Sequence, residues 1–266
     1  MRGDGDRRGS KAYFKAAGMA VFFWIICPAA VAQKVPPTAG VDPFITAIET
    51  ARRSVGSLDC MAVDGAEAKI LERIGSAFLI SATGDFLTAA HVVKDMQKGD
   101  RHCPTPAITL PAGDWRPEAR TEAMLWFPFK ILACKMDSTL DIAICPLSGD
   151  LAARRSELRL KAAPVQFEWS IPPDGTQVAF TGFPLRARDP MTFRANVAAY
   201  RIPWPDEPTP ELILDHAALP GFSGSPVYLA NGKIAAILVK DGKDETTGIT
   251  IARPASAFRE MLAKKP

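Results

Sequence analysis

The chain has 266 residues, of which 47% are hydrophobic and 23% charged, and its formal net charge is +3. This composition is that of an ordinary globular protein, so it excludes wholesale disorder, a collagen-like repeat and a membrane protein with many spans. Because acidic and basic residues nearly balance, no strongly basic face is expected, and nucleic acid is not an expected partner.

The first 32 residues are typical of a secretory signal peptide. A basic start is followed by an apolar run over 16–27 and then by Ala30-Val31-Ala32, a small-residue cleavage motif. The run is shorter than the roughly 20 apolar residues that span a bilayer, although an uncleaved anchor stays as the alternative. We therefore expect cleavage after Ala32, a periplasmic or secreted location, and no membrane attachment after cleavage.

Short apolar runs separated by turn signals fill most of the remaining chain, as an all-β protein requires. A segment at 33–55 contains a short helix over 43–54, and a closing helix is predicted over 254–264. Between them we expect a first β-barrel at 56–150 and a second at 165–266. The predicted strands of the first are 67–74, 76–81, 86–89, 106–110, 121–127, 129–136 and 141–147. Those of the second are 176–182, 192–202, 211–216, 225–230, 233–239 and 247–252.

Four cysteines follow the signal peptide, and in an exported protein an even number suggests disulfides, with three possible connectivities. Cys134 and Cys145 lie on the two predicted strands of a hairpin whose loop contains 137–140, so they fall opposite one another and are expected to bond. Cys60 and Cys103 would then form the second pair. Buried free thiols are the alternative. No Cys-x-x-Cys or His-x-x-x-His spacing occurs, so no metal site is expected.

Histidine is scarce, which makes a general base easy to search for. His91 follows the strand predicted at 86–89, where small residues let the chain turn. His102 lies in a polar stretch that reads as a solvated loop, and His216 ends a predicted strand. His91 is therefore the candidate base.

A glycine-flanked serine and an isolated aspartate complete the candidate site. Ser223 lies in the segment PGFSGSP at 220–226, whose glycines allow a tight turn with converging N–H groups, as an oxyanion hole needs. Asp141 opens an apolar strand and needs a partner if it is buried. An ordinary turn and a structural aspartate are the alternatives. Since no histidine follows Ser223, the α/β-hydrolase order is impossible, whereas the order His91, Asp141, Ser223 is that of chymotrypsin-like proteases.

These motifs together resemble trypsin-like serine peptidases, most nearly the protease domains of bacterial HtrA-type enzymes. The resemblance implies an all-β fold of two six-stranded antiparallel β-barrels, chymotrypsin-like, with a C-terminal helix and no metal or organic cofactor. It covers about residues 56–262, so no PDZ domain is expected after it. The segments that carry it are GSAFLI at 75–80, GDFLTAAHVV at 84–93, DIAI at 141–144, TGFP at 181–184, GFSGSP at 221–226 and GITIA at 248–252.

The resemblance implies an exported serine endopeptidase that hydrolyses polypeptides. Ser223 would attack the scissile carbonyl, His91 would carry the proton, and Asp141 would orient His91. The backbone N–H groups of Gly221 and Ser223 would hold the oxyanion.

Two departures from the family pattern leave other functions open. Phe222 stands where the family has Asp or Asn, and Ser225 replaces a glycine. A catalytically weak binding protein of the same fold is therefore one alternative, and an esterase or acyl transferase on the same residues is another. Phe222 also predicts that activity needs no newly cut N-terminus, because a phenyl ring cannot pair with an ammonium group.

The resemblance further suggests where a substrate would bind. Ala217 lies six residues before the serine, where relatives that cleave after Arg or Lys carry an acid, so small or medium aliphatic residues are expected before the cut. Val239, Lys240 and Asp241 would form the edge that pairs with the substrate backbone. Asp241 is the residue that would reverse this specificity if it reached the pocket.

Overall fold

The computed structural model of the protein describes residues 42–65, 67–97, 103–111, 124–149, 151, 165–202, 209–239 and 248–263. The expected signal peptide at 1–32 lies outside these residues, as do His102, Lys240 and Asp241. Within the described ranges, no helix combines the length and the apolar character needed to cross a bilayer.

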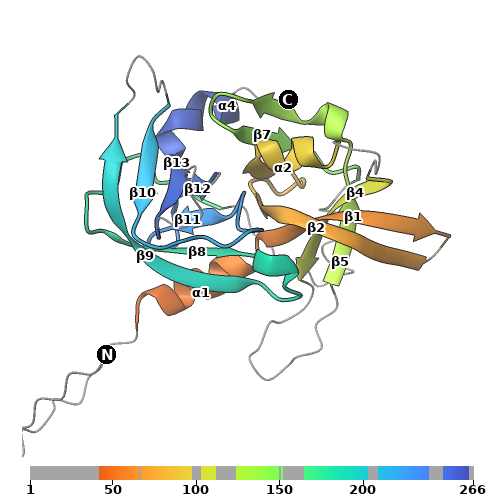
Figure 1. Ribbon diagram of the computed structural model, residues 1–266, viewed down its shortest axis with the longest axis horizontal. Coiled ribbons are helices and arrows are strands. Elements are labelled where there is room, and N and C mark those ends of the chain that lie inside the picture. The colour runs from red at the N-terminus through yellow and green to blue at the C-terminus, as the bar shows by residue number, and fades with distance from the viewer. Residues whose placement is uncertain are drawn as a thin grey trace, which may run out of the picture. The chain divides into compact units, whose positions relative to one another are not determined.

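The first β unit is a seven-stranded antiparallel sheet in the order β5-β4-β1-β2-β3-β7-β6 (Figure 1). Helix α2 (Ala90–Asp95) follows β3, and the 3-10 turn η1 (Ile131–Ala133) precedes β6. The strands are β1 (Val55–Asp64), β2 (Glu67–Leu79), β3 (Phe86–Ala89), β4 (Thr105–Pro111), β5 (Met124–Pro128), β6 (Lys135–Asp137) and β7 (Ile142–Cys145).

This sheet differs from the closed six-stranded barrel expected for the first unit. Among the described residues its outer strands β5 and β6 do not pair with each other, and an isolated bridge from Phe129 to Leu147 links the segments that follow β5 and β7. The sheet rolls around its own apolar cluster, which includes Leu58, Phe86 and Ile108. It is therefore a half-barrel of seven strands.

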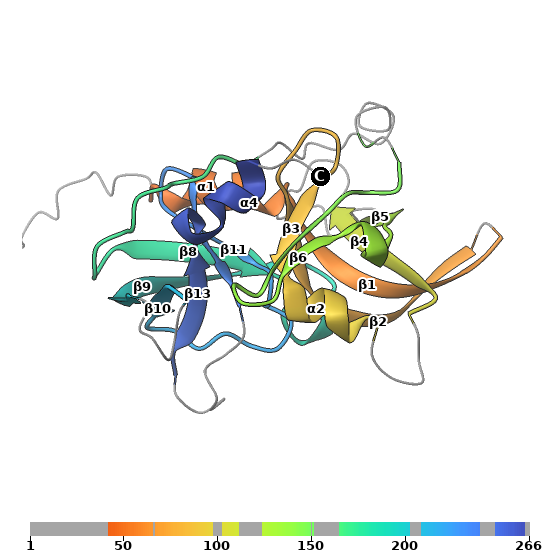
Figure 2. The same ribbon diagram turned by 90° about the horizontal axis from the view of Figure 1, so that it is seen from above.

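In the long β1–β2 hairpin, strand β1 is the element that sequence patterns missed. Its first seven residues, 55–61, are all buried, so β1 lacks the alternation of apolar and polar residues that reveals a strand. Strand β2 runs without a break through Gly75, where two separate strands were expected. The hairpin projects away from the second β unit in both views (Figures 1 and 2).

The second β unit is a closed six-stranded barrel in the order β10-β13-β12-β11-β8-β9, as predicted. The 3-10 turn η2 (Pro184–Arg186) connects β8 to β9. The barrel, the half-barrel and the short terminal helix confirm the predicted chymotrypsin-like fold class. The strands are β8 (Gln177–Gly182), β9 (Met191–Arg201), β10 (Glu211–Leu214), β11 (Pro226–Tyr228), β12 (Ile234–Leu238) and β13 (Thr250–Pro254).

An apolar layer joins the two β units. It contains Phe78 and Leu87 from the sheet and Tyr228 and Ile237 from the barrel, all essentially inaccessible to solvent. Helix α1 (Phe44–Arg52), which matches the predicted helix, and the C-terminal η3 (Ala255–Phe258) pack against the same layer. Helix α4 (Arg259–Ala263) continues from η3, and Figure 2 shows α1 and α4 at one side of the barrel. Burial of this layer holds together the two β units that carry the candidate site residues.

Candidate active site

His91 is held against Asp141 by two contacts. It is the second residue of α2, and its Nδ1 lies 2.7 Å from Oδ2 of Asp141, while its backbone N–H donates to Oδ1 at 2.8 Å. The histidine side chain is 29% exposed and the aspartate side chain 21%. Because a carboxylate only accepts hydrogen bonds, Nδ1 carries the proton in neutral histidine, which leaves Nε2 as a free acceptor.

The turn that presents Asp141 is fixed by several hydrogen bonds. Asp141 has a left-handed φ of 57°, which is uncommon for a residue other than glycine. Oδ1 of Asp137 accepts from the N–H groups of Thr139 and Leu140, both at 2.9 Å, and the carbonyl of Asp141 accepts from the N–H of Ala90 at 3.0 Å. These bonds hold an unfavourable backbone conformation in place and aim the carboxylate at His91.

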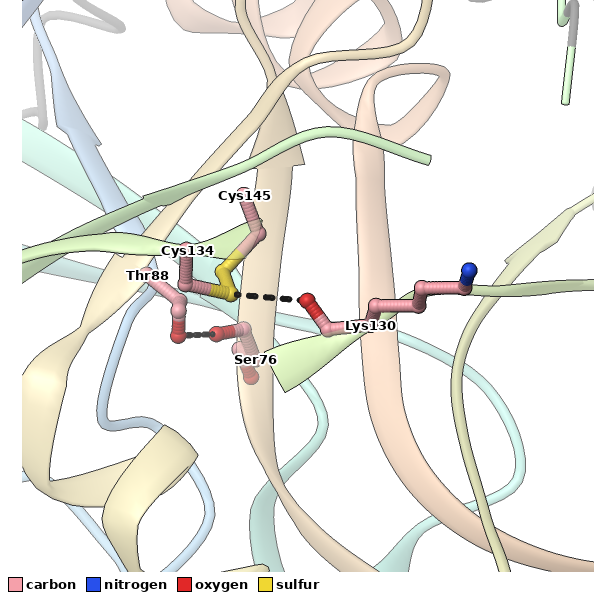
Figure 3. The surroundings of a disulfide bond; sticks show 5 residues. All are labelled: Ser76, Thr88, Lys130, Cys134 and Cys145. Atoms are coloured by element: carbon pink, nitrogen blue, oxygen red, sulfur yellow. Dashed lines mark hydrogen bonds between the residues drawn. A yellow bond between two sulfur atoms is a disulfide. The ribbon is translucent and has the colours of Figure 1, made fainter. Parts of the chain in front are cut away.

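A disulfide closes the hairpin that carries this turn. Cys134 and Cys145, eleven positions apart, are bonded, and the second pair, Cys60 and Cys103, is bonded as well. Sγ of Cys134 lies 3.9 Å from the carbonyl oxygen of Lys130. Figure 3 shows this contact beside the disulfide. The Cys134–Cys145 bond ties the two ends of the β6–β7 hairpin and so limits how far the Asp141 turn can move.

Two glycines let the Ser223 loop approach its neighbours closely. Gly221 and Gly224 have φ values of +98° and +87°. A Cβ on Gly221 would lie 2.5 Å from the carbonyl oxygen of Phe183, and one on Gly224 only 2.0 Å from that of Ser76. Both distances are far below contact, so only glycine fits at either position.

The loop keeps two backbone N–H groups unpaired. In the part of the chain that the structure describes, the N–H groups of Gly221 and Ser223 have no hydrogen-bond acceptor. The carbonyls of the same two residues are used instead. Oγ of Ser76 donates to Gly221 at 2.7 Å and accepts from Phe183 at 2.9 Å, and the N–H of Ser76 donates to the Ser223 carbonyl at 2.9 Å. Two free donors on a braced loop suit an oxyanion hole.

Gly75 separates the serine loop from the histidine helix. A Cβ on Gly75 would lie 2.8 Å from the side chain of Val92, the neighbour of His91, and 3.1 Å from the carbonyl oxygen of Ser223. The half-buried Ser223 and the helix of His91 therefore flank the same glycine. The structure joins His91 to Asp141, but among the described residues no hydrogen bond links Ser223 to His91.

Phe222 is buried inside the second barrel. Its ring is inaccessible to solvent and lies 5.0 Å from the ring centroids of both Phe180 and Phe193, edge-on to Phe180. This packing anchors the loop one residue before Ser223. The neighbouring Ser225 is buried too, and its Oγ has no hydrogen-bond partner among the described residues.

The predicted substrate-contacting residues are described in part. Val239 is buried, and its N–H donates to the Ile251 carbonyl at 3.2 Å. Ala217 is half-buried in a segment clamped by Thr250, whose Oγ1 donates to the carbonyl of His216 and accepts from the N–H of Ala218, both at 2.6 Å. Thr250 had no role of its own in the sequence interpretation. Its position in an apolar predicted strand was the only sign that it would be buried.

Buried charges were missed as well. Asp59 on β1 is inaccessible to solvent, with Oδ2 accepting from Ser57 at 2.9 Å and Oδ1 3.5 Å from Nε of Arg73. Burial raises the pKa of Asp59, although the neighbouring Thr109 hydroxyl, the charge of Arg73 and the hydrogen bond from Ser57 oppose the rise. Arg73 also donates to the carbonyl of Ala187 in the loop beside η2. A charged residue on a strand gives no sequence signal of such a contact.

Comparison with known proteins agrees with this geometry. No match was found among curated proteins. Three solved structures of the Rv3671c protease of M. tuberculosis are similar in fold, each aligned over 86% of this chain. The active form is 17% identical, with a TM-score of 0.56, and 88% of its chain is covered. An inactive form is 18% identical, with a TM-score of 0.57 and 98% of its chain covered. An inactive serine-to-alanine mutant is 17% identical, with a TM-score of 0.56 and 95% of its chain covered. The model of the trypsin-like peptidase domain matches residues 75–237, more than half of the chain. The chain therefore belongs to the trypsin-like peptidase family, whose members are serine-type peptidases.

Proposed function

We propose that the protein is an exported serine endopeptidase that cuts polypeptides with His91, Asp141 and Ser223. The observation that carries the proposal is the double contact of the Asp141 carboxylate with His91, which leaves Nε2 free on the helix that faces the Ser223 loop across Gly75. A solvated structural histidine does not need its ring and its backbone N–H held by the same carboxylate.

The proposed reaction assigns one step to each group. Nε2 of His91 takes the proton of Ser223 Oγ as that oxygen attacks the scissile carbonyl, and it later delivers the proton to the leaving amine. Asp141 holds the imidazole orientation and stabilises the imidazolium. The N–H groups of Gly221 and Ser223 stabilise the oxyanion, a contribution of about 3 kcal/mol for each donor. Water then takes the place of the amine. Nε2 of His91 accepts a proton from water as it attacks the acyl-enzyme, and returns the proton to Ser223 Oγ as the acid product leaves.

Export is proposed from two features of the chain. The segment at 1–32 has the order of a signal peptide, and both described cysteine pairs are bonded. Disulfides of this kind persist in oxidising compartments, such as the periplasm or the cell exterior.

Specificity for small or medium aliphatic residues before the cut is proposed from the segment around Ala217. That position supplies no charge, and the Thr250 bridge between His216 and Ala218 supports a short, rigid wall there. Val239 would offer its carbonyl to the substrate backbone at the edge. Digestion of a proteome-derived peptide library should give cuts after Ala, Val or Leu, and dominant cleavage after Arg would contradict the proposal.

The function is tested with the chain starting at Gln33. We expect hydrolysis of the peptide library, loss of hydrolysis in Ser223→Ala and in His91→Ala, and unchanged circular dichroism in both variants. A fluorophosphonate probe should label the parent protein but not Ser223→Ala. No labelling of the parent would favour a binding protein instead, and turnover of ester substrates without peptide cleavage would favour an esterase.

A further inference from the structure

An arginine of the second barrel reaches the Asp141 turn of the first sheet. Arg253 lies on β13, and its side chain is only 6% exposed. Its Nε donates to the carbonyl of Leu140 at 3.0 Å, and its Nη1 donates to the carbonyl of Pro210 at 2.5 Å and lies 4.0 Å from Oε1 of Glu211. A buried guanidinium is retained where several acceptors fit its fixed fork of donors.

The Leu140 carbonyl belongs to the peptide that precedes the left-handed Asp141. The turn itself satisfies the groups around it: Asp137 accepts from the N–H of Leu140, and the N–H of Ala90 donates to the carbonyl of Asp141. In the described part of the chain, Arg253 provides the hydrogen bond to the Leu140 carbonyl. It therefore links the second barrel to this turn by a hydrogen bond, beside the apolar packing of the Leu140 side chain against the layer between the two β units.

The charges around the guanidinium are arranged on both sides of the boundary. Glu211 on β10 faces it from the barrel, and Asp137 and Asp141 face it from the turn. Burial lowers the pKa of Arg253, and these three carboxylates oppose that effect. On the outer side of the turn, Lys94 of α2 donates to the hydroxyl of Ser138 at 2.8 Å.

We propose that Arg253 is a positioning residue for the reaction, which holds the Asp141 turn so that its carboxylate reaches both Nδ1 and the backbone N–H of His91. The inference rests on the proposed function. It adds that the geometry of the acid in the first sheet depends on a side chain of the second barrel, whereas Arg253 itself touches no reacting group.

The kinetic test compares Arg253→Met with Arg201→Met on a peptide substrate from the library. Arg201 lies 3.5 Å from the other carboxylate oxygen of Glu211 and is 54% exposed. Among the described residues it makes no hydrogen bond to Leu140, so it is a matched control. We expect Arg253→Met to lower kcat at least tenfold with KM within twofold, and Arg201→Met to match the parent. Arg253→Lys, which keeps a donor for one carbonyl, should recover part of kcat. Equal kcat in Arg253→Met and Arg201→Met would overturn the proposal.

Amide hydrogen exchange measures the turn without any turnover. In a Ser223→Ala background, Arg253→Met should speed exchange at Leu140 and Ala90 at least tenfold, while the Leu229 amide, bonded to Lys233 at the far side of the barrel, should not change. Unchanged exchange at Leu140 would contradict the proposal that Arg253 holds the Asp141 turn. If the parent protein hydrolyses no peptide, the proposed function fails, yet this measurement still tests Arg253.

A second variant covers loss of folding. Removing Arg253 alone leaves the partly buried Glu211 with only Arg201 as an ion-pair partner among the described residues, and loss of a charge partner destabilises a fold. Arg253→Met combined with Glu211→Gln removes both charges. The same fall in kcat and the same faster exchange at Leu140 are expected in the double variant, and parent-like values in it would refute the proposal.

Discussion

The two loops that carry the candidate site are fixed by different combinations of contacts. The Asp141 turn is held by hydrogen bonds that Asp137 accepts and that Ala90 and Arg253 donate. In the Ser223 loop, Ser76 bonds two backbone carbonyls, and close contacts at the glycines and burial of Phe222 do the rest. The difference follows from the chemistry. An aspartate must stay charged and aimed, which needs polar partners, whereas an oxyanion hole must keep its N–H groups free, so its loop cannot be fixed through them.

Each loop is nevertheless braced by an arginine from the other half of the fold. Arg253 of the barrel donates to Leu140 beside the Asp141 turn. Arg73 of the sheet donates to the carbonyl of Ala187, which follows η2. In η2, the N–H of Leu185 donates to the carbonyl of Pro220, where the Ser223 loop begins. Each half of the fold thus stabilises the site loop of the other half. The effect of substitutions at one loop can therefore be compared with the effect of substitutions at the other.

The largest expected effect is a loss of kcat on substitution in the Asp141 turn. Asp141→Asn should lower kcat by about 10⁴-fold, because an amide favours the wrong histidine tautomer. The matched control is Asp137→Asn, whose amide oxygen still accepts from Thr139 and Leu140, and it should cost less than tenfold. Steady-state kinetics on a library-derived peptide measures both. A loss below tenfold in Asp141→Asn would show that this carboxylate does not orient His91.

Substitution in the Ser223 loop should instead lower the stability of the protein. Phe222→Ala removes a fully buried ring and is expected to lower the free energy of unfolding by about 3–5 kcal/mol. Phe222→Leu keeps most of the volume and should cost roughly 1 kcal/mol. Urea denaturation of both variants gives the comparison, and a cost below that range for Phe222→Ala would mean that the loop does not rely on the aromatic cluster.

The two disulfides separate local from global support. In the loop-entropy treatment, the short Cys134–Cys145 loop contributes about 3 kcal/mol and the longer Cys60–Cys103 loop about 4 kcal/mol to stability. Replacing the first pair by alanine should lower kcat more, because it loosens the Asp141 hairpin. Replacing the second pair should lower the unfolding free energy more. Measuring both properties on both variants checks the contrast, and the reverse ranking in kcat would contradict it.

A buried carboxyl in the sheet predicts a modest pH effect. Because burial raises the pKa of Asp59 above its ordinary 3.8, the folded protein holds that proton more tightly than the unfolded chain. The resulting contribution to stability is full below pH 3.8 and is lost as pH rises through the higher pKa of the folded state. Asp59→Asn should therefore gain stability relative to the parent as pH rises from 4 to 7, and a falling difference in denaturation midpoints would be the contrary result.

The smallest expected effect tests the preformed loop. Because Phe222 is already buried among aromatic rings, a tag placed before Gln33 should change kcat/KM less than twofold. Activity that appears only after tag removal would indicate that a free N-terminus orders the loop.

Sequence patterns predicted the features that depend on local chemistry. Strand β3, the glycines around Ser223 and the hairpin pairing of Cys134 with Cys145 all follow from residue type and spacing. Strand β1 was missed because it is buried along most of its length, and α2 was missed because it spans only six residues.

The supports that cross between the two halves could not be predicted. Arg253 and Arg73 lie in strands whose partners are remote in the sequence, and Ser76 looks like any small residue of a β-strand. Their roles depend on how the sheet and the barrel dock, which no local pattern encodes.

The Ser76 contacts have a consequence for biosynthesis. The bond from Ser76 to Gly221 joins residues 145 positions apart, and that from Arg253 to Leu140 joins residues 113 apart. A chain emerging from the ribosome lacks both until its last strands are made and docked, because such distant contacts form late. We expect the nascent protein to be inert while its own unfolded segments are the nearest available substrate, so that self-digestion is avoided by the order of assembly alone.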